Sequence, residues 1–174
     1  IDQLVERVLQ AEGSPRVFVR MVSDEVLAAM SDAEHPQGVL AVCRIPELTW
    51  AQVAERRPRL VAVMCRVQDP GNAGTVLRAA DAAGADAVVL TAGSVDLHNP
   101  KVVRSTAGSL FHLPVLTGQD PAELVGRPVS DAAGGELQVL AADGYGALDL
   151  DELQDASAAG REAAVELSRP TAWL

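Results

Sequence analysis

Aromatic residues are scarce in this chain of 174 residues, where phenylalanine, tryptophan and tyrosine together make up 3%. Hydrophobic residues nevertheless account for 48% and charged residues for 22%, which is typical of a globular protein and not of a disordered one. The core must therefore be built from valine, leucine and alanine. The length suffices for one ordinary domain or for two small ones.

Long apolar runs and cysteines are also few. The longest unbroken apolar runs, such as residues 60–65, have about six residues, whereas a membrane-spanning helix needs roughly 20. We therefore expect no membrane association. Two cysteines, Cys43 and Cys65, exclude a disulfide scaffold and a four-cysteine zinc site. Both lie in strand patterns, so we expect core thiols in a reduced, cytoplasmic setting.

Lysine is nearly absent, with one residue against 13 arginines, and the net charge is −10. That charge argues against a nonspecific nucleic-acid binder. Half of the cations, however, lie in residues 56–104, which carry 7 basic and 4 acidic side chains. Arginine offers a planar fork that suits phosphate. Charge alone leaves open whether this stretch is a solvated face or a phosphate-binding surface.

Short elements of both kinds are predicted before residue 49. The apolar spacing predicts helices over 2–11 and 23–30, with Ser23 as N-cap of the second. Strands are predicted over 16–21 and 39–44. We expect residues 1–48 to be the tail of a small α/β domain, and residues 49–58 to be a linker that contains a short helix.

From Leu60 onwards, strand patterns alternate with helix patterns, which predicts βαβ units and a parallel sheet. The predicted strands are 60–67, 86–91, 113–116, 137–142 and 171–174. The predicted helices are 75–83, 99–107, 120–125 and 160–167, with loops over 69–74 and 126–136. The chain begins with Ile and stops within the last predicted strand, so we expect further residues at both ends.

The densest chemical signal is the run Gln-Asp-Pro-Gly-Asn-Ala-Gly-Thr-Val-Leu-Arg-Ala-Ala over residues 68–80. It follows a strand and opens a helix, an arrangement whose backbone N–H groups favour anions. Gly71 and Gly74 allow the backbone to bend and to approach a ligand. Asn72 and Arg78 are the candidate functional side chains. In the alternative interpretation, Asn72 only caps the helix and Arg78 only pairs with Asp81 on a solvated face.

Other nucleotide, metal and nucleophile motifs are missing. No P-loop lysine follows the glycines, and residues 144–146 lack the third glycine of a dinucleotide fingerprint. The three histidines have no metal-ligand spacing, so we expect no metal site. No Gly-x-Ser-x-Gly elbow is present. A small-molecule domain that binds phosphate with the 71–74 loop remains an alternative.

The stretch 68–115 resembles the SpoU/TrmH family of RNA ribose 2′-O-methyltransferases. The family's first motif, an Asn, a Gly and an Arg at this spacing after a strand, matches Asn72, Gly74 and Arg78. The run Val-Asp-Leu-His-Asn-Pro-Lys-Val-Val-Arg-Ser-Thr-Ala-Gly over 95–108 is similar to that family's second helix and its approach. Residues 23–44 resemble the tail of a ribosomal-protein-like RNA-binding domain. The resemblance covers most of the chain.

This resemblance implies an α/β-knot (SPOUT-type) methyltransferase domain over 59–174, preceded by part of a small α/β RNA-binding domain over 1–48. The family's later motifs, a Gly-Asn-Glu-x-x-Gly loop and a Ser-Leu-Asn-Val segment, are expected after Leu174. They form the knot, most of the S-adenosylmethionine pocket and much of the dimer interface. We therefore expect this chain to carry one catalytic wall without the knot, and the complete protein to be a homodimer.

The reaction implied is methyl transfer from S-adenosylmethionine to a ribose 2′-hydroxyl of structured RNA, with 23S rRNA favoured over tRNA. In it, Arg78 clamps a phosphate and stabilises the developing alkoxide, while Asn72 orients Arg78 or the ribose. Lys101 and Arg104 would hold RNA phosphates.

The cofactor edge is expected at the end of the fourth strand of the domain, where the backbone of Leu140, Ala141, Ala142 and Gly144 would contact S-adenosylmethionine. An alternative from another class is a non-catalytic RNA-binding protein that uses the 71–74 loop as a phosphate cradle.

Overall fold

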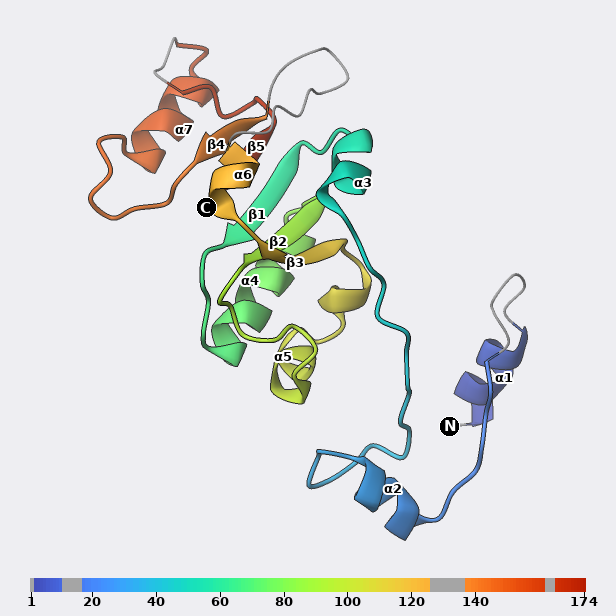
Figure 1. The fold of residues 1–174 in the computed structure, drawn as a ribbon. Coiled ribbons are helices and arrows are strands. Elements are labelled where there is room, and N and C mark those ends of the chain that lie inside the picture. Colours follow the sequence, from blue (N-terminus) through green and yellow to red (C-terminus); the bar gives the residue numbers. More distant parts are fainter. Residues whose placement is uncertain (1, 11–16, 126–136, 162–164) are drawn as a thin grey trace. The chain divides into compact units, whose positions relative to one another are not determined.

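The computed structural model describes residues 2–10, 17–125, 137–161 and 165–174. The chain divides into two compact units, Ile1–Pro46 and Glu47–Leu174 (Figure 1). No helix in the described ranges is long and apolar enough to cross a membrane.

The first unit contains two helices, α1 (Asp2–Gln10) and α2 (Asp24–Met30). Both were predicted, and Ser23 caps α2 by accepting a hydrogen bond from the Val26 amide. The predicted strands are wrong, because residues 17–23 and 39–49 form neither helix nor strand. A strand needs a neighbour to pair its backbone groups, and a β-branched run cannot supply one alone. Accordingly Val42 is 89% exposed and Cys43 is exposed, so the expected core thiol is wrong too.

A parallel sheet forms the centre of the second unit. Its strands are β1 (Leu60–Met64), β2 (Ala87–Thr91), β3 (Val115–Gln119), β4 (Gln138–Leu140) and β5 (Thr171–Trp173). They lie in the order β3-β2-β1-β5-β4, and all neighbours are parallel. Strand β1 is central, with Val61 opposite Ala87 on one side and Ala172 on the other. The predicted parallel α/β sheet is confirmed.

The helices of this unit are α3 (Trp50–Glu55), α4 (Pro70–Ala82), α5 (Pro100–Ser105), α6 (Pro121–Val125) and α7 (Leu150–Ala158). A short 3-10 helix, η1 (Ser109–Phe111), follows α5. The helix predicted over 160–167 is wrong where it is described, since residue 161 and residues 165–167 are not helical. Helix α7 ends before it, with Gly160 at φ +62°, and Asp149 caps its start. Residues 162–164 and the predicted loop 126–136 lie outside the described residues.

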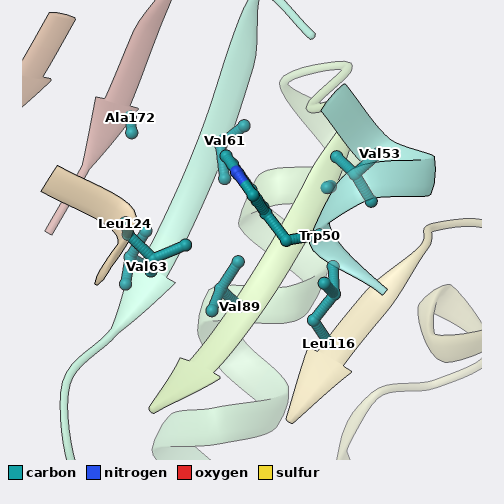
Figure 2. Close-up of a cluster of buried hydrophobic side chains, with 9 residues drawn as sticks. Trp50, Val53, Val61, Val63, Val89, Leu116, Leu124 and Ala172 are labelled. Atoms are coloured by element: carbon teal, nitrogen blue, oxygen red, sulfur yellow. The ribbon is translucent and has the colours of Figure 1, made fainter. Parts of the chain in front are cut away.

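Two hydrophobic clusters lie on opposite faces of the sheet, because successive side chains of a strand point to opposite sides. Figure 2 shows the first cluster, in which Trp50 and Val53 of α3 pack with Val61, Val89 and Leu116. The second cluster joins α4 and α5 to the other face through Leu77, Val102, Val88 and Leu90. Residues 49–58, expected as a linker, thus include a helix that packs in the core of the second unit.

Candidate functional site

The loops after β1, β2 and β3 meet at one edge of the sheet, since the carboxyl ends of parallel strands lie together. The sequence prediction extended the first strand to residue 67, but β1 ends at Met64. Cys65 therefore lies beyond the strand and is exposed, against the expectation of a core thiol. Residues 65–69 connect β1 to α4 at this edge.

Helix α4 begins earlier than predicted. Asp69 is its N-cap and accepts a hydrogen bond from the Asn72 amide at 2.7 Å, while Pro70 occupies the first turn. Residues 70–74, predicted as a loop, are therefore helical. The cap is Asp69, so the interpretation of Asn72 as the capping residue is wrong. The Asn72 side chain is instead exposed to solvent in the first turn of α4.

At Gly74, α4 packs closely against α5. A Cβ on Gly74 would lie 2.0 Å from Ser105 Oγ and 2.6 Å from the Ser105 carbonyl carbon. Ser105 Oγ also lies 2.8 Å from the carbonyl oxygen of Pro70, to which it can donate. The glycine therefore serves helix packing, whereas the sequence interpretation assigned it to close approach of a ligand.

Arg78 lies six residues after Asn72, which corresponds to roughly 9 Å along the axis of α4. Its guanidinium Nη2 is 3.5 Å from Thr75 Oγ1, so the exposed side chain leans toward the start of the helix. No hydrogen bond joins it to Asn72 in the part of the chain that the structure describes. Arg78 can thus present its fork toward the edge where Asn72 lies.

The alternative partner of Arg78, Asp81, is engaged elsewhere. Its Oδ2 lies 2.8 Å from Nδ1 of His112, which follows η1. Hydrogen bonds from His112 and then from Ser109 hold the pKa of the Asp81 carboxyl below its ordinary value. This contact attaches η1 to the C-terminal half of α4 and leaves Arg78 free of that ion pair.

We expect acid to weaken this attachment. Because the pKa of Asp81 is lower in the folded state, its contribution to stability is present above the unfolded pKa of about 4 and is lost as the pH falls through the folded value. Asp81→Asn should therefore lower the free energy of unfolding at pH 6 more than at pH 3, as measured by urea unfolding. An equal loss at both pH values would contradict the prediction.

Lys101 and Arg104 lie on α5 as predicted, and both side chains are exposed. Asn99 caps this helix by accepting a hydrogen bond from the Lys101 amide at 2.9 Å, and Pro100 is its first residue. Since α5 packs against α4 through Ser105, these two cations and Arg78 belong to adjacent helices. Their proposed contacts to RNA phosphates stay a prediction.

The predicted cofactor residues follow the carboxyl end of β4, the strand that lies outermost on the β5 side of the sheet. Leu140 is half-buried, whereas Ala141, Ala142 and Gly144 are exposed. The Ala142 amide donates to the Leu174 carbonyl oxygen at 2.7 Å, so that N–H group is already engaged. Strand β5 separates these residues from β1 and the start of α4.

A pocket of about 220 Å³ was missed by the sequence reasoning. It opens at the ends of β2 and β3 and is lined by Leu90, Leu97, Gly93, Ser94, Asp96, Thr117 and Gly118, among others. Arg66 is exposed beside it: its Nε would lie 3.8 Å from a Cβ on Gly93. Residues 95–97 belong to the 95–108 run noted above, but the pocket also needs residues 117–118, which the pairing of β2 with β3 brings beside residues 90–94.

Comparisons with known proteins agree with this arrangement. The model of the SpoU rRNA Methylase family matches residues 59–165. The chain is 47% identical over 96 residues to the 23S rRNA (guanosine(2553)-2′-O)-methyltransferase RlmP of Bacillus subtilis, which covers 55% of this chain and 37% of that protein. It is 31% identical to the 23S rRNA (uridine(2479)-2′-O)-methyltransferase of Streptomyces viridochromogenes, over 76% of this chain and 46% of that one.

A solved structure shares the fold. The SpoU methyltransferase AviRb from Streptomyces viridochromogenes, in complex with the cofactor AdoMet, matches with a TM-score of 0.58 and 28% identity over 75% of this chain and 47% of the other. The chain thus spans less than half the length of these three proteins. Because the family model matches more than half of its residues, the chain belongs to the SpoU rRNA Methylase family.

Proposed function

We propose that the complete protein transfers a methyl group from S-adenosylmethionine to a ribose 2′-hydroxyl of ribosomal RNA, with 23S rRNA as the favoured substrate. The observation that carries the proposal is the placement of Asn72 in the first turn of α4, which follows the carboxyl end of β1, with Arg78 exposed further along the same helix, in a chain of this family. Two relatives named as 23S rRNA 2′-O-methyltransferases support the substrate class.

Arg78 would act by charge and geometry. A 2′-hydroxyl is a weak nucleophile. Its proton would pass to solvent water as the bond from its oxygen to the methyl carbon forms, and the sulfur–carbon bond would break to release S-adenosylhomocysteine. A guanidinium with a pKa above about 12 is a poor base, but its fork can hold a phosphate and stabilise the developing negative oxygen. Asn72 would orient the Arg78 side chain or the ribose from the first turn of α4.

Other parts of the protein would hold the RNA. Lys101 and Arg104, one helical turn apart on α5, are placed to bind phosphates. Residues 1–48 would belong to an RNA-binding domain that selects the substrate. The complete protein would act in the cytoplasm as a homodimer.

The residues at the end of β4 fit one wall of a cofactor site. Ala141, Ala142 and Gly144 are small and exposed, and a Cβ on Gly144 would meet no atom within 4 Å, so a flat nucleoside has room along this backbone. Leu140, half-buried, would add an apolar contact. When bound there, S-adenosylmethionine supplies a reactive methyl group on a sulfonium. The protein's own task is then to position the hydroxyl.

The complete protein, incubated with methyl-labelled S-adenosylmethionine and separately with 23S rRNA and with tRNA, should label 23S rRNA. Alkaline hydrolysis locates the label, because a 2′-O-methylated ribose lacks the hydroxyl that cleaves the chain. Label on tRNA alone would show that the substrate is tRNA and not ribosomal RNA. RNA binding without label would favour the phosphate-cradle interpretation, and neither label nor binding would favour a small-molecule ligand.

A further inference from the structure

The pocket at the ends of β2 and β3 has the size and lining of a site for one planar group. Leu90 and Leu97 lie beneath its surface and are almost completely buried, while Ala92 and Val95 add small apolar groups to the accessible lining. Its volume of about 220 Å³ is smaller than the roughly 300–1,000 Å³ typical of pockets for drug-sized ligands. The lining also includes the polar residues Ser94, Asp96 and Thr117. A small pocket with both apolar and polar lining residues suits the ring of a nucleobase.

Ser94 provides an unused hydrogen-bonding group in this pocket. Its Oγ is buried and has no hydrogen-bond partner within the described residues, although its amide donates to the Thr91 carbonyl oxygen. Buried hydroxyls are nearly always paired, because an unpaired one costs free energy. The Oγ has almost no accessible surface, so a ligand in the pocket supplies the missing partner once the Ser94 side chain rotates its hydroxyl toward the pocket.

The charge of Asp96 disfavours a phosphate in the pocket itself. Asp96 lines it with an exposed carboxylate, whose Oδ1 accepts a hydrogen bond from the His98 amide at 2.9 Å. A carboxylate repels an anion but accepts hydrogen bonds from the amino and imino groups of a base. The neutral part of a nucleotide therefore belongs in the pocket.

Arg66 provides the complementary charge at the rim. Its backbone has φ +52°, a left-handed conformation that is unfavourable for a residue with a side chain. The hydroxyl of buried Thr91 accepts a hydrogen bond from the Arg66 amide at 2.8 Å and holds this turn next to β2. The exposed guanidinium lies beside Gly93 of the pocket, and among the described residues no carboxylate pairs with it.

We propose that this pocket and Arg66 together bind one nucleotide of the RNA substrate, with its base against Ser94 and its phosphate on Arg66. This inference rests on the proposed function, because it assumes that RNA is the substrate and that the nucleotide in this pocket lies near the ribose that is methylated. The loop that carries Arg66 continues through Asp69 into α4, so the nucleotide bound here lies on the same edge as Asn72.

Arg57 offers a matched control for a test of this site. It has φ +54°, is exposed, and precedes β1, whereas Arg66 follows it. Arg57→Gly and Arg66→Gly thus remove the same charge and relieve the same backbone strain at opposite ends of one strand. Neither should lower the thermal unfolding temperature.

Affinity of the complete protein for 23S rRNA, measured by filter binding over a range of salt concentrations, should separate the two variants. Arg66→Gly should weaken binding about tenfold and reduce the slope of log affinity against log salt by about 1. Arg57→Gly should change neither quantity beyond the small effect of one distant charge. Ser94→Ala should weaken binding about three- to tenfold with an unchanged salt slope, since a base contact releases no counterion.

Equal affinities for the Arg66→Gly and Arg57→Gly variants would overturn the phosphate contact, and full affinity for Ser94→Ala would overturn the base contact. Methyl transfer by the unaltered protein is measured in parallel. If it labels RNA while the Arg66 and Ser94 variants bind normally, this inference fails and the proposed function stands. If no label appears while those variants still lose RNA affinity as expected, the proposed function fails and the nucleotide site stands.

Discussion

Arg78→Ala is expected to lower the rate of methyl transfer to RNA by about 10²- to 10³-fold, the usual effect of removing one group that stabilises a developing oxyanion. Among the described residues, the exposed guanidinium hydrogen-bonds only with Thr75 Oγ1, so the fold should lose less than about 0.5 kcal/mol. Single-turnover rates with saturating RNA measure the effect, and thermal unfolding verifies that the variant is folded.

Two further variants sharpen this test. Arg78→Lys keeps the charge without the fork, and should recover only part of the rate because a point charge cannot bind phosphate in bidentate fashion. Arg56→Ala removes an exposed arginine at the end of α3, before β1, and should leave the rate unchanged. If Arg78→Ala weakened RNA binding but kept the full single-turnover rate, Arg78 would be a phosphate anchor only.

Gly74→Ala is expected to lower the free energy of unfolding by about 1–3 kcal/mol, the range typical of overpacking a core. Alanine favours a helix by about 1 kcal/mol over glycine, but the added Cβ would lie 2.0 Å from Ser105 Oγ, so α5 must move away from α4. Urea unfolding measures the loss as a lower midpoint concentration of urea, provided that the slope of free energy against urea concentration is unchanged.

The position of the Ser105 backbone gives this prediction a second part. The added Cβ would also lie 2.6 Å from the Ser105 carbonyl carbon, so Ser105→Gly should not rescue the Gly74→Ala variant. Gly71→Ala is a milder comparison in the same helix, because its Cβ would lie 3.0 Å from Asp69 Oδ1, the acceptor that caps α4, which need shift by only a few tenths of an ångström. Equal stability of the Gly71→Ala and Gly74→Ala variants would show that α4 and α5 do not need this close contact.

The sheet could be predicted from the sequence because its strands are short apolar runs that a core can bury on both faces. Val61 and Val63 enter one cluster and Met64 the other, as a central parallel strand requires. The same type of run over 39–44 forms no strand, since its side chains find no partner to bury them. Local pattern indicates what a segment can form, whereas pairing decides what it does form.

Helix ends were harder to predict where two local signals compete. Gly71 and Gly74 favour a loop, but Asp69 and Pro70 start α4 before them, and the packing against Ser105 compensates for the poor helix propensity of glycine. Helix α7 was missed because it is acidic and contributes no buried residue, so it lacks the apolar stripe on which the prediction depended.

The candidate site was predictable only where it is continuous in sequence. Asn72 and Arg78 belong to one run, and the family resemblance could identify them together. The nucleotide pocket combines residues 90–97 with residues 117–118. Arg66 lies beside it because its backbone adopts a left-handed conformation, which arginine does not favour and which its residue type therefore does not predict. Such features depend on which strands become neighbours, and this information is absent from local spacing.

The pairing of β1 with β5 has a consequence for how the chain folds during synthesis. Thr171 pairs with Leu60, more than 100 residues earlier, whereas the other edge of β1 pairs with nearby β2. A ribosome would therefore release β1 with one edge unpaired and keep it so until β5 emerges. Exposed edges of this kind promote association between chains, and such distant pairings form slowly. The strand that anchors the site thus keeps an edge open to pairing with another chain for most of the time that this domain is being synthesised.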